Sequence, residues 1–207
     1  MKMRTVYAML IALLMVMPRL AMGHELGFGG AAFDGHSQSD SYSVSNGGHT
    51  DWALFLHYDH DMKWEKNVDE NLKLGLMPGM IHTYAHWTKG YNIDYQVCGA
   101  KYNGECREWG CKTVHTVKYR NIDSHMPSVY LKAYATLFDK YKAFAFAGPG
   151  AEFADDGTWV TFTYGGGLQY NFTKNLGLEA TAYEIYSDVG GDYRRFDVAG
   201  LAFVLRW

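Results

Sequence analysis

The sequence has few of the features that mark the commonest protein classes. After residue 17 no apolar run approaches the ~20 residues that a membrane-spanning helix needs, which excludes a helical membrane protein. Only 20% of the 207 residues are charged and four are proline, whereas 16% are aromatic, which excludes a disordered chain. Lysine and arginine total 19 against 22 acidic residues, so we expect no nucleic-acid partner. The length fits one domain whose apolar residues are dispersed among polar ones, as in β-strands.

Residues 1–23 have the three parts of a secretory signal peptide. A positively charged start precedes an apolar core at residues 6–17, and small residues then mark a cleavage site before His24. The apolar core is too short to span a membrane well. The sequence therefore predicts cleavage near Gly23 and a mature barrel domain at residues 24–207.

Eight segments of the mature domain alternate apolar residues with polar or small ones, which is the period of a strand with two different faces. We expect strands at about residues 24–33, 51–63, 71–88, 128–137, 142–152, 159–171, 175–186 and 194–207. One face is apolar and often aromatic, whereas the other carries Gly, Thr, Ala and Gln with isolated charges. The second face suits the interior of a narrow barrel, and the first then contacts lipid. Because proline cannot donate to a ladder, we expect a register break at Pro78.

The connections between these segments alternate in length. Three are short, at residues 64–70, 138–141 and 172–174, and two are long and polar, at residues 34–50 and 89–127. Outer-membrane barrels have short periplasmic turns and longer outer loops, and closure leaves no unpaired edge in lipid. We therefore expect an all-β fold, an eight-stranded antiparallel up-and-down transmembrane β-barrel in the bacterial outer membrane.

Three stretches in the second half of the chain carry a resemblance to a known family. They are AFAFAGPGAEF, TFTYGGGLQYNFTKNLGLEATAYEIYSD and FDVAGLAFVLRW. With its Gly-rich sixth strand, short turn and Tyr-rich seventh strand, the segment 129–207 resembles the OmpA/OmpX-type small outer-membrane β-barrel superfamily. The segment 24–128 matches only in its strand rhythm. The resemblance implies a small barrel whose outer loops carry its function.

The final strand ends on an aromatic residue after an alternating apolar run. The run consists of Leu201, Phe203, Leu205 and Trp207. It resembles the signal by which bacterial outer-membrane proteins are handed to the barrel-assembly machinery. We expect that machinery as a partner during biogenesis, and outer-membrane lipid and lipopolysaccharide as the surroundings of the mature barrel.

Isolated charges fall on the face assigned to the interior. They are Glu25, Lys73, Lys132, Glu179 and Arg206. Charges buried in a barrel need partners, and an eight-stranded interior is only just wide enough for side chains. We therefore expect an ion-pair network that fills the lumen and blocks a wide channel.

All three cysteines, Cys98, Cys106 and Cys111, lie in the expected loop at residues 89–127. In an exported protein a disulfide is the default, and one pair leaves one thiol over. Cys106–Cys111 is the nearest pair, whereas Cys98–Cys111 would enclose more chain, and the pairing stays open. Zinc bound by Cys106, Cys111 and His115 is an alternative, although this spacing matches no strong signature.

The histidines show no metal-binding pattern. His82 and His86 would lie on the same face of a strand, but ~13 Å apart, which is too far for one ion. We expect neither a metal site nor a bound cofactor in this chain.

The tripeptide Asp123-Ser124-His125 contains residue types that hydrolases and acyltransferases use, and some small outer-membrane barrels modify lipid A. Ser124 and His125 would point to opposite faces of an extended segment, so a base for Ser124 must come from another loop. Three histidines could serve as that base: His36, His49 and His115. Asp and Ser also favour a simple turn before a strand, which is the preferred interpretation.

The sequence thus favours a structural or interaction protein without intrinsic catalysis. Its working parts are expected to be the loops at residues 34–50 and 89–127, which would bind an extracellular ligand. Two alternatives stay open: a lipid A-modifying enzyme, by acyl transfer or deacylation, and a narrow pore.

Overall fold

The computed structural model describes residues 24–37, 51–60, 64–98, 101–102, 105–106, 111–155, 157–189 and 192–207. The expected signal peptide and most of the expected loop at residues 34–50 lie outside these ranges. The strands are β1 (His24–Ser37), β2 (Trp52–His60), β3 (Trp64–Asn67), β4 (Leu72–Cys98), β5 (Lys101–Tyr102), β6 (Glu105–Cys106), β7 (Cys111–Leu137), β8 (Tyr141–Ala154), β9 (Gly157–Asn171), β10 (Leu176–Val189) and β11 (Asp192–Arg206). Among the described residues, no helix has the length and apolarity needed to cross a membrane.

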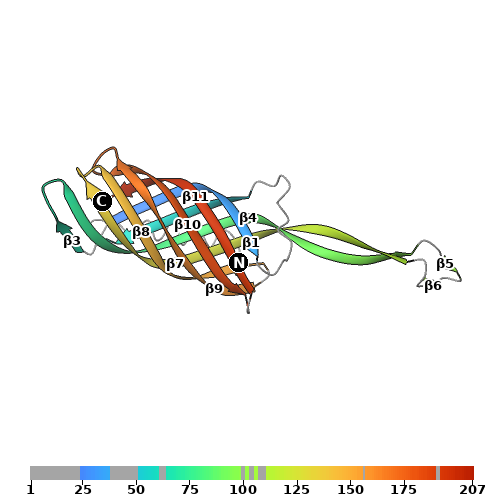
Figure 1. The fold of residues 1–207 in the computed structure, drawn as a ribbon. Coiled ribbons are helices and arrows are strands. Elements are labelled where there is room, and N and C mark those ends of the chain that lie inside the picture. Colours follow the sequence, from blue (N-terminus) through green and yellow to red (C-terminus); the bar gives the residue numbers. More distant parts are fainter. Residues whose placement is uncertain are drawn as a thin grey trace.

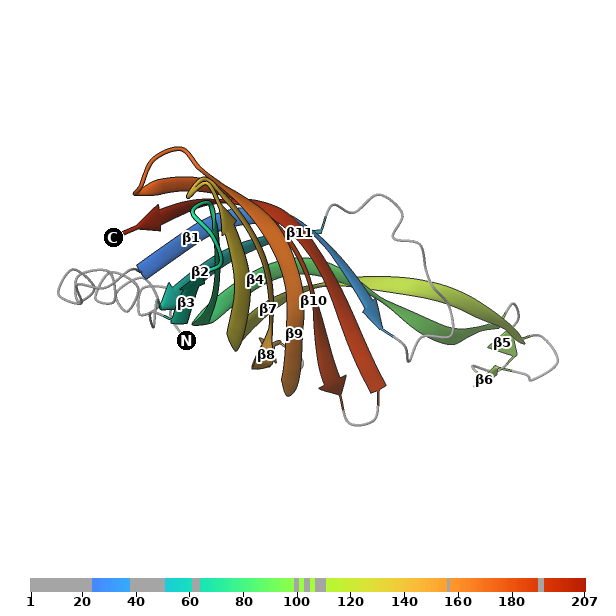
Figure 2. The same cartoon turned by 60° about the vertical axis from the view of Figure 1, so that its left-hand side comes forward.

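The strands close into one antiparallel barrel (Figure 1; Figure 2). Their order is β2-β1-β11-β10-β9-β8-β7-β4, and β4 pairs back with β2. The short β3 pairs with β4 beyond the end of β2, so β2 and β3 together occupy the place of a single barrel strand. The barrel therefore has eight strands, which confirms the predicted fold class.

Alternating side chains determine which face of each strand points inward. Along β8, Lys142, Phe144 and Phe146 are buried, whereas the residues between them are exposed. Outside, the barrel carries a band of exposed apolar side chains that includes Phe28, Leu54, Val129, Leu131, Val160, Phe162, Leu168, Leu201, Phe203 and Leu205. An apolar outer face around a tightly filled interior is the arrangement that a small transmembrane barrel requires.

Glycines on β9 let large interior side chains come close to the backbone. A Cβ at Gly167 would lie 2.6 Å from the ring of Phe144, and one at Gly165 would lie 2.3 Å from the Cβ of Tyr183. Both distances are too short for any side chain. The Gly165–Gly167 run therefore makes room for aromatic packing.

The expectation of a loop at residues 89–127 is wrong. β4 and β7 stay paired without a register break from Leu72 opposite Leu137 to Cys98 opposite Cys111. Each has 27 residues, whereas β8 to β11 have 14 or 15. The physical reason is that an alternating pattern continues through Tyr91-Asn92-Ile93-Asp94-Tyr95-Gln96-Val97, which suits two long paired strands.

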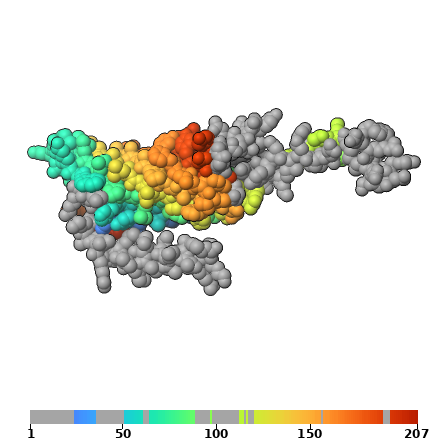
Figure 3. Space-filling view, turned by 90° about the horizontal axis from the view of Figure 1, so that it is seen from below, coloured from blue at the N-terminus to red at the C-terminus, as the bar shows by residue number. Residues whose placement is uncertain are grey.

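The extra length forms a two-stranded ribbon, here called the projecting hairpin (residues 87–98 and 111–123), whose base at Trp87 and Ile122 still packs in the barrel core. β2 pairs with β4 only as far as His86, and β8 pairs with β7 only from Ser124. Twelve residues at ~3.3 Å each carry the hairpin about 40 Å past its neighbours. Both ribbon views show this extension (Figure 1; Figure 2), and the space-filling view shows the packed barrel from which it leaves (Figure 3).

The register break expected at Pro78 occurs on one edge of β4 only. Towards β7, Pro78 stands opposite Leu131 in an unbroken register. On the other edge of β4, the pairing with β2 ends where Asp59 stands opposite Gly79. Pairing resumes with β3, where Trp64 stands opposite Leu76, and the register has shifted by two residues. The missing N–H of a proline explains why pairing stops there on one side.

Candidate functional site: barrel interior, outer groove and projecting hairpin

The middle of the interior is organised around one buried carboxylate. Asp59 on β2 accepts a short charged hydrogen bond from Lys132 Nζ and another, of 2.6 Å, from the hydroxyl of Tyr130. His57 lies between two acids, with one ring nitrogen 3.3 Å from Asp59 and the other 3.3 Å from Glu179. All five side chains are buried, so each charge faces an opposite charge or a donor inside the barrel.

A second group closes the interior at the short-turn end. Lys142 Nζ donates to Glu25 Oε1 at 2.5 Å, and Arg206 Nε lies 2.6 Å from the same oxygen. The Lys142 ammonium also lies 4.7 Å from the centre of the Tyr134 ring. Residues of β1, β7, β8 and β11 are thereby joined across the lumen.

A third group lies in the half of the interior nearest the projecting hairpin. Ser124 Oγ donates to Glu152 at 3.1 Å and accepts a 3.0 Å hydrogen bond from Trp87 Nε1. Arg194 approaches Glu152 at 3.5 Å and lies 4.2 Å from the ring of Trp159. Ser124 and Glu152 are completely buried, so this group is packed inside the wall and not open to a substrate.

The structure brings four of the five expected interior charges into the lumen. Glu25, Lys132, Glu179 and Arg206 belong to the two groups at the middle and at the short-turn end. Lys73 instead lies at the rim, where its side chain is 32% exposed and its ammonium lies 2.8 Å from Asp139. Lys73 therefore pairs with an acidic residue of a turn and not with the charges inside the lumen.

Sequence reasoning missed most of the partners of these charges. His57 and Asp59 lie on the polar face of the second expected strand, so their inward direction could have been inferred from the alternation. Lys142 was hidden because alanine and glycine blur the pattern of the fifth segment.

Ser124 and His125 point to opposite faces, as the alternation predicts. His125 is outside the barrel, with Nδ1 3.3 Å from His82 Nε2, and His86 pairs with Asp123 at 2.7 Å on the same outer face. No described histidine contacts Ser124. The three proposed bases, His36, His49 and His115, have side chains that lie outside the described part of the chain.

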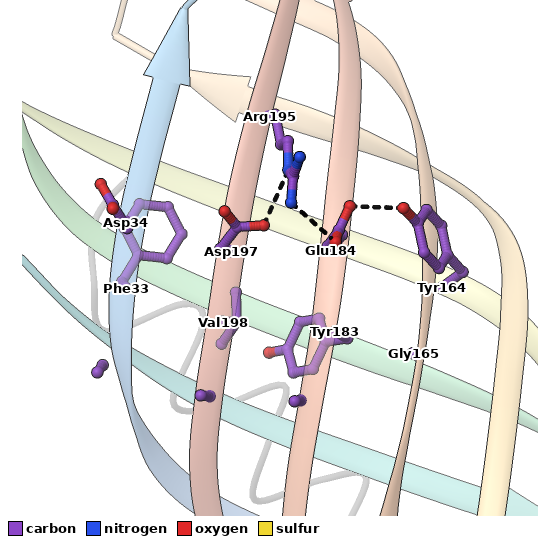
Figure 4. A pocket seen from close by; sticks show the side chains of 12 residues that line it. Phe33, Asp34, Tyr164, Gly165, Tyr183, Glu184, Arg195, Asp197 and Val198 are labelled. Atoms are coloured by element: carbon purple, nitrogen blue, oxygen red, sulfur yellow. Dashed lines mark hydrogen bonds and ion pairs between the residues drawn. The ribbon is translucent and has the colours of Figure 1, made fainter. Parts of the chain in front are cut away.

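A groove of about 530 Å³ lies on the outer wall, over β1, β9, β10 and β11 (Figure 4). Small residues form part of its lining: Ala32, Ala182 and Ala199. At its upper edge Arg195 contacts Glu184 at 2.9 Å and Asp197 at 3.0 Å, and Tyr164 donates to Glu184 at 2.5 Å. The groove thus combines an alanine floor with a charged rim.

The cysteines lie at the far end of the projecting hairpin. Cys98 and Cys111 are directly opposite each other in the backbone register, and Cys106 lies in β6. The side chains of all three, and of His115, lie outside the described part, so the disulfide and zinc hypotheses stay predictions. Among the described side chains, no group of three or more His, Cys, Asp or Glu converges on a common point.

The residues of the expected assembly signal lie on the outer face of the last strand. Leu201, Phe203 and Leu205 are exposed on β11. The backbone of Trp207 pairs with His24, through N–H···O distances of 3.0 and 3.2 Å. The last residues therefore close the barrel against β1.

Comparison with solved structures identifies the fold. Neisserial surface protein A is similar at a TM-score of 0.51 and 12% identity, over 90% of this chain and 99% of that one. The chain has the outer-membrane β-barrel fold. Two further barrels are similar at a TM-score of 0.45: Ail of Yersinia pestis (13% identity, 88% of this chain and 98% of Ail) and the outer membrane enzyme PagL (12% identity, 87% and 98%).

No protein-family model matches this outer-membrane barrel, and no curated protein matches it in sequence. One fold can host many unrelated activities, so the likeness in fold does not specify the activity. A function must therefore be argued from the barrel's own interior and surfaces.

Proposed function

We propose that this outer-membrane barrel is an interaction protein that binds an extracellular polypeptide through its projecting hairpin, without catalysis. The observation that carries the proposal is the pair of unpaired strand edges along the hairpin. Beyond His86, β4 has a neighbour on one side only, and before Ser124 the same holds for β7, among the described strands. Among the described strands the hairpin therefore has two edges without a neighbouring strand, each about a dozen residues long, and on the β4 edge only the Thr88 N–H has a described side-chain partner, Asp51 at 3.1 Å.

An unpaired edge is a row of backbone N–H and C=O groups without protein partners, and it is a template for another strand. An extended segment that added to it would gain main-chain hydrogen bonds, and the alternate side chains of the hairpin would select its sequence. Tyr91, Ile93, Tyr95 and Val97 alternate with polar residues along β4. A polypeptide with similar alternation is the partner that this edge fits.

The remainder of the barrel suits an anchor better than a channel. Its middle is filled by the group around Asp59 and by buried aromatic residues such as Phe55, Phe144 and Tyr183. Side chains that pack to this extent leave no continuous column of water in an eight-stranded barrel. The filled interior supports the proposal that the lumen is blocked and that the barrel serves as an anchor.

The location of the mature protein is part of the same proposal. Removal of residues 1–23 would release the chain to the periplasm, and the terminal run that ends at Trp207 would deliver it to the barrel-assembly machinery. Outer-membrane lipid and lipopolysaccharide would then surround the exposed apolar band. Heat-modifiable migration of outer-membrane fractions on gels tests closure and location together.

The test of the interaction trims the projecting hairpin without touching the barrel. Gly90 and Tyr119 are cross-strand partners, so an Asn-Gly turn that replaces residues 91–118 would join them in register. Cells that display the full or the trimmed protein are compared for adhesion to a panel of immobilised extracellular matrix and serum proteins. Loss of adhesion with unchanged heat-modifiable migration is expected, whereas equal adhesion would contradict the proposal.

A lipid A-modifying activity is tested on Ser124. Because Ser124 is buried between Glu152 and Trp87, Ser124→Ala should leave the lipid A of expressing cells unchanged and cost about 1–3 kcal/mol of stability. The readouts are mass spectrometry of lipid A and urea unfolding in detergent. A lipid A species that requires the wild-type protein and disappears with Ser124→Ala would show an enzyme instead.

A further inference from the structure

Three polar side-chain atoms converge at the first residue of the predicted mature chain. His24 on β1 is the cross-strand partner of His60 on β2, and their Nδ1 atoms are 3.2 Å apart. The Tyr58 hydroxyl lies 2.7 Å from the same His24 Nδ1, and the Trp207 ring packs beside it at 5.9 Å. The start of β1 and the end of β11 lie at the barrel end away from the projecting hairpin (Figure 2).

Hydrogen bonding alone does not account for this convergence. An imidazole nitrogen has either one hydrogen or one lone pair, so His24 Nδ1 makes a strong two-centre hydrogen bond to only one of its two polar neighbours. Two ring nitrogens 3.2 Å apart, however, both lie ~2.0–2.1 Å from an ion when the angle at that ion is about 100°. That angle lies between the square-planar and tetrahedral values, which late transition metal ions adopt in proteins.

We propose that cleavage of the signal peptide before His24 creates a metal site here, for a divalent late transition ion that is bound most tightly as Cu(II). The ligands are the freed α-amine of His24, the Nδ1 of His24 and the Nδ1 of His60. The proposal rests on the cleavage position that the sequence predicts. Imidazole nitrogen suits copper, nickel and zinc, and copper stands highest in the order of affinities.

The α-amine supplies the third ligand that side chains alone lack. It belongs to the same residue as Nδ1, so the two nitrogens close a chelate ring whose formation needs no new contact between elements. Among the described side chains no group of three ligands converges, which is consistent with a main-chain nitrogen completing the set. The Tyr58 hydroxyl, 2.7 Å from His24 Nδ1, would then lie close enough to hydrogen-bond to a fourth ligand such as a bound water.

Metal binding leaves the closure of the barrel intact. The backbone nitrogen of His24 donates to the carbonyl of Trp207 at 3.0 Å. A terminal amine that binds a metal through its lone pair keeps two hydrogens, so one of them still donates to Trp207. The ion would thus be held where β1, β2 and the last residue of the chain meet.

The chain contains its own matched control. His82 and His125 on the outer face have ring nitrogens 3.3 Å apart, almost the separation of the His24–His60 pair, but no terminal amine. If two close imidazoles were sufficient, both pairs would bind equally. The proposal requires that the His24 site bind Cu(II) far more tightly than the His82–His125 pair.

The experiment uses the full protein, exported with its own signal sequence and purified in detergent from outer membranes. Intact mass first establishes the mature N-terminus. Cu(II) is then titrated against a competing chelator, and electron paramagnetic resonance reports the nitrogen ligands. One ion per chain with three nitrogen ligands is expected.

Two variants remove one element of the site each. His60→Ala removes an imidazole, and insertion of Gly-Ser-Gly-Ser between Gly23 and His24 moves the amine away while both histidines stay. Each should weaken Cu(II) binding by more than ~100-fold, because loss of a residue that only hydrogen-bonds to a metal ligand already costs up to that much. The double variant His82→Ala/His125→Ala should bind as the wild type does. Heat-modifiable migration verifies that every variant is folded.

The outcomes that overturn the proposal are distinct from a failure of the proposed interaction. A mature chain that begins at any residue other than His24 would remove the amine from the site and refute it. A chain that begins at His24 but binds Cu(II) no better than His60→Ala or the extended variant would refute the metal site and leave the cleavage prediction standing. Neither result bears on adhesion through the projecting hairpin.

Discussion

At the scale of single residues, the barrel interior shows how closely burial and charge pairing are linked. The alternation of the sequence predicts that Lys132 and Glu179 point inward, because residues two apart share a face of a strand. It does not predict that Asp59 and Glu179 face each other across His57, since those contacts depend on the curvature of the closed barrel. The direction of a side chain is local information, whereas its partner is not.

The pairing of Lys132 with Asp59 supports a stability prediction. Lys132→Met leaves a fully buried carboxylate without its cation, which costs about 3–5 kcal/mol for a buried pair. Urea unfolding in detergent, followed by tryptophan fluorescence, measures the loss. Lys132→Met combined with Asp59→Leu and Tyr130→Phe should recover part of it, because replacing paired polar groups by apolar ones is often neutral, whereas His57 still loses its contact with Asp59. If the single variant were as stable as the wild type, Asp59 would not depend on Lys132.

At the scale of the elements, the sequence predicts the eight strands better than their lengths. Lys142 begins the inward face of a strand that alanine and glycine make hard to delimit, yet its centre is placed correctly. The projecting hairpin was missed because Gly90, Asn92 and Asp94 are typical of loops, although alternate positions carry large residues. Cross-strand pairing over 27 residues outweighs these local preferences.

The glycines of β9 provide a test of interior packing. A Cβ at Gly167 would lie 2.3 Å from the Ala180 carbonyl oxygen, so Gly167→Val should cost at least the ~1–3 kcal/mol of ordinary overpacking. Gly30 on β1 is the matched control, because its Cβ would meet nothing closer than 3.9 Å on the outer face. Gly30→Val should therefore leave urea unfolding nearly unchanged. Equal losses in the two variants would show that the inward glycine has no special role.

At the scale of the whole molecule, the two ends of the barrel differ in what they carry. One end holds short turns, the start of β1 and the end of β11, and the other holds the projecting hairpin (Figure 2). Between them the lumen is crossed by buried groups from several strands. The proposed interaction and the proposed metal site therefore lie at opposite ends of a barrel whose lumen is filled by side chains.

This filled interior predicts that the protein does not conduct ions as a wide pore does. Phe144 and Phe146 project into the centre, where Lys132 lies 4.4 Å from the ring of Phe144. In planar bilayers the wild type should show no stable conductance steps, because the side chains leave no continuous water path. Phe144→Gly combined with Phe146→Gly removes two rings from that path and should introduce small steps, if gels show that it remains a closed barrel. Stable steps from the wild type itself would mean that the interior groups move aside in the membrane and that the barrel is a pore.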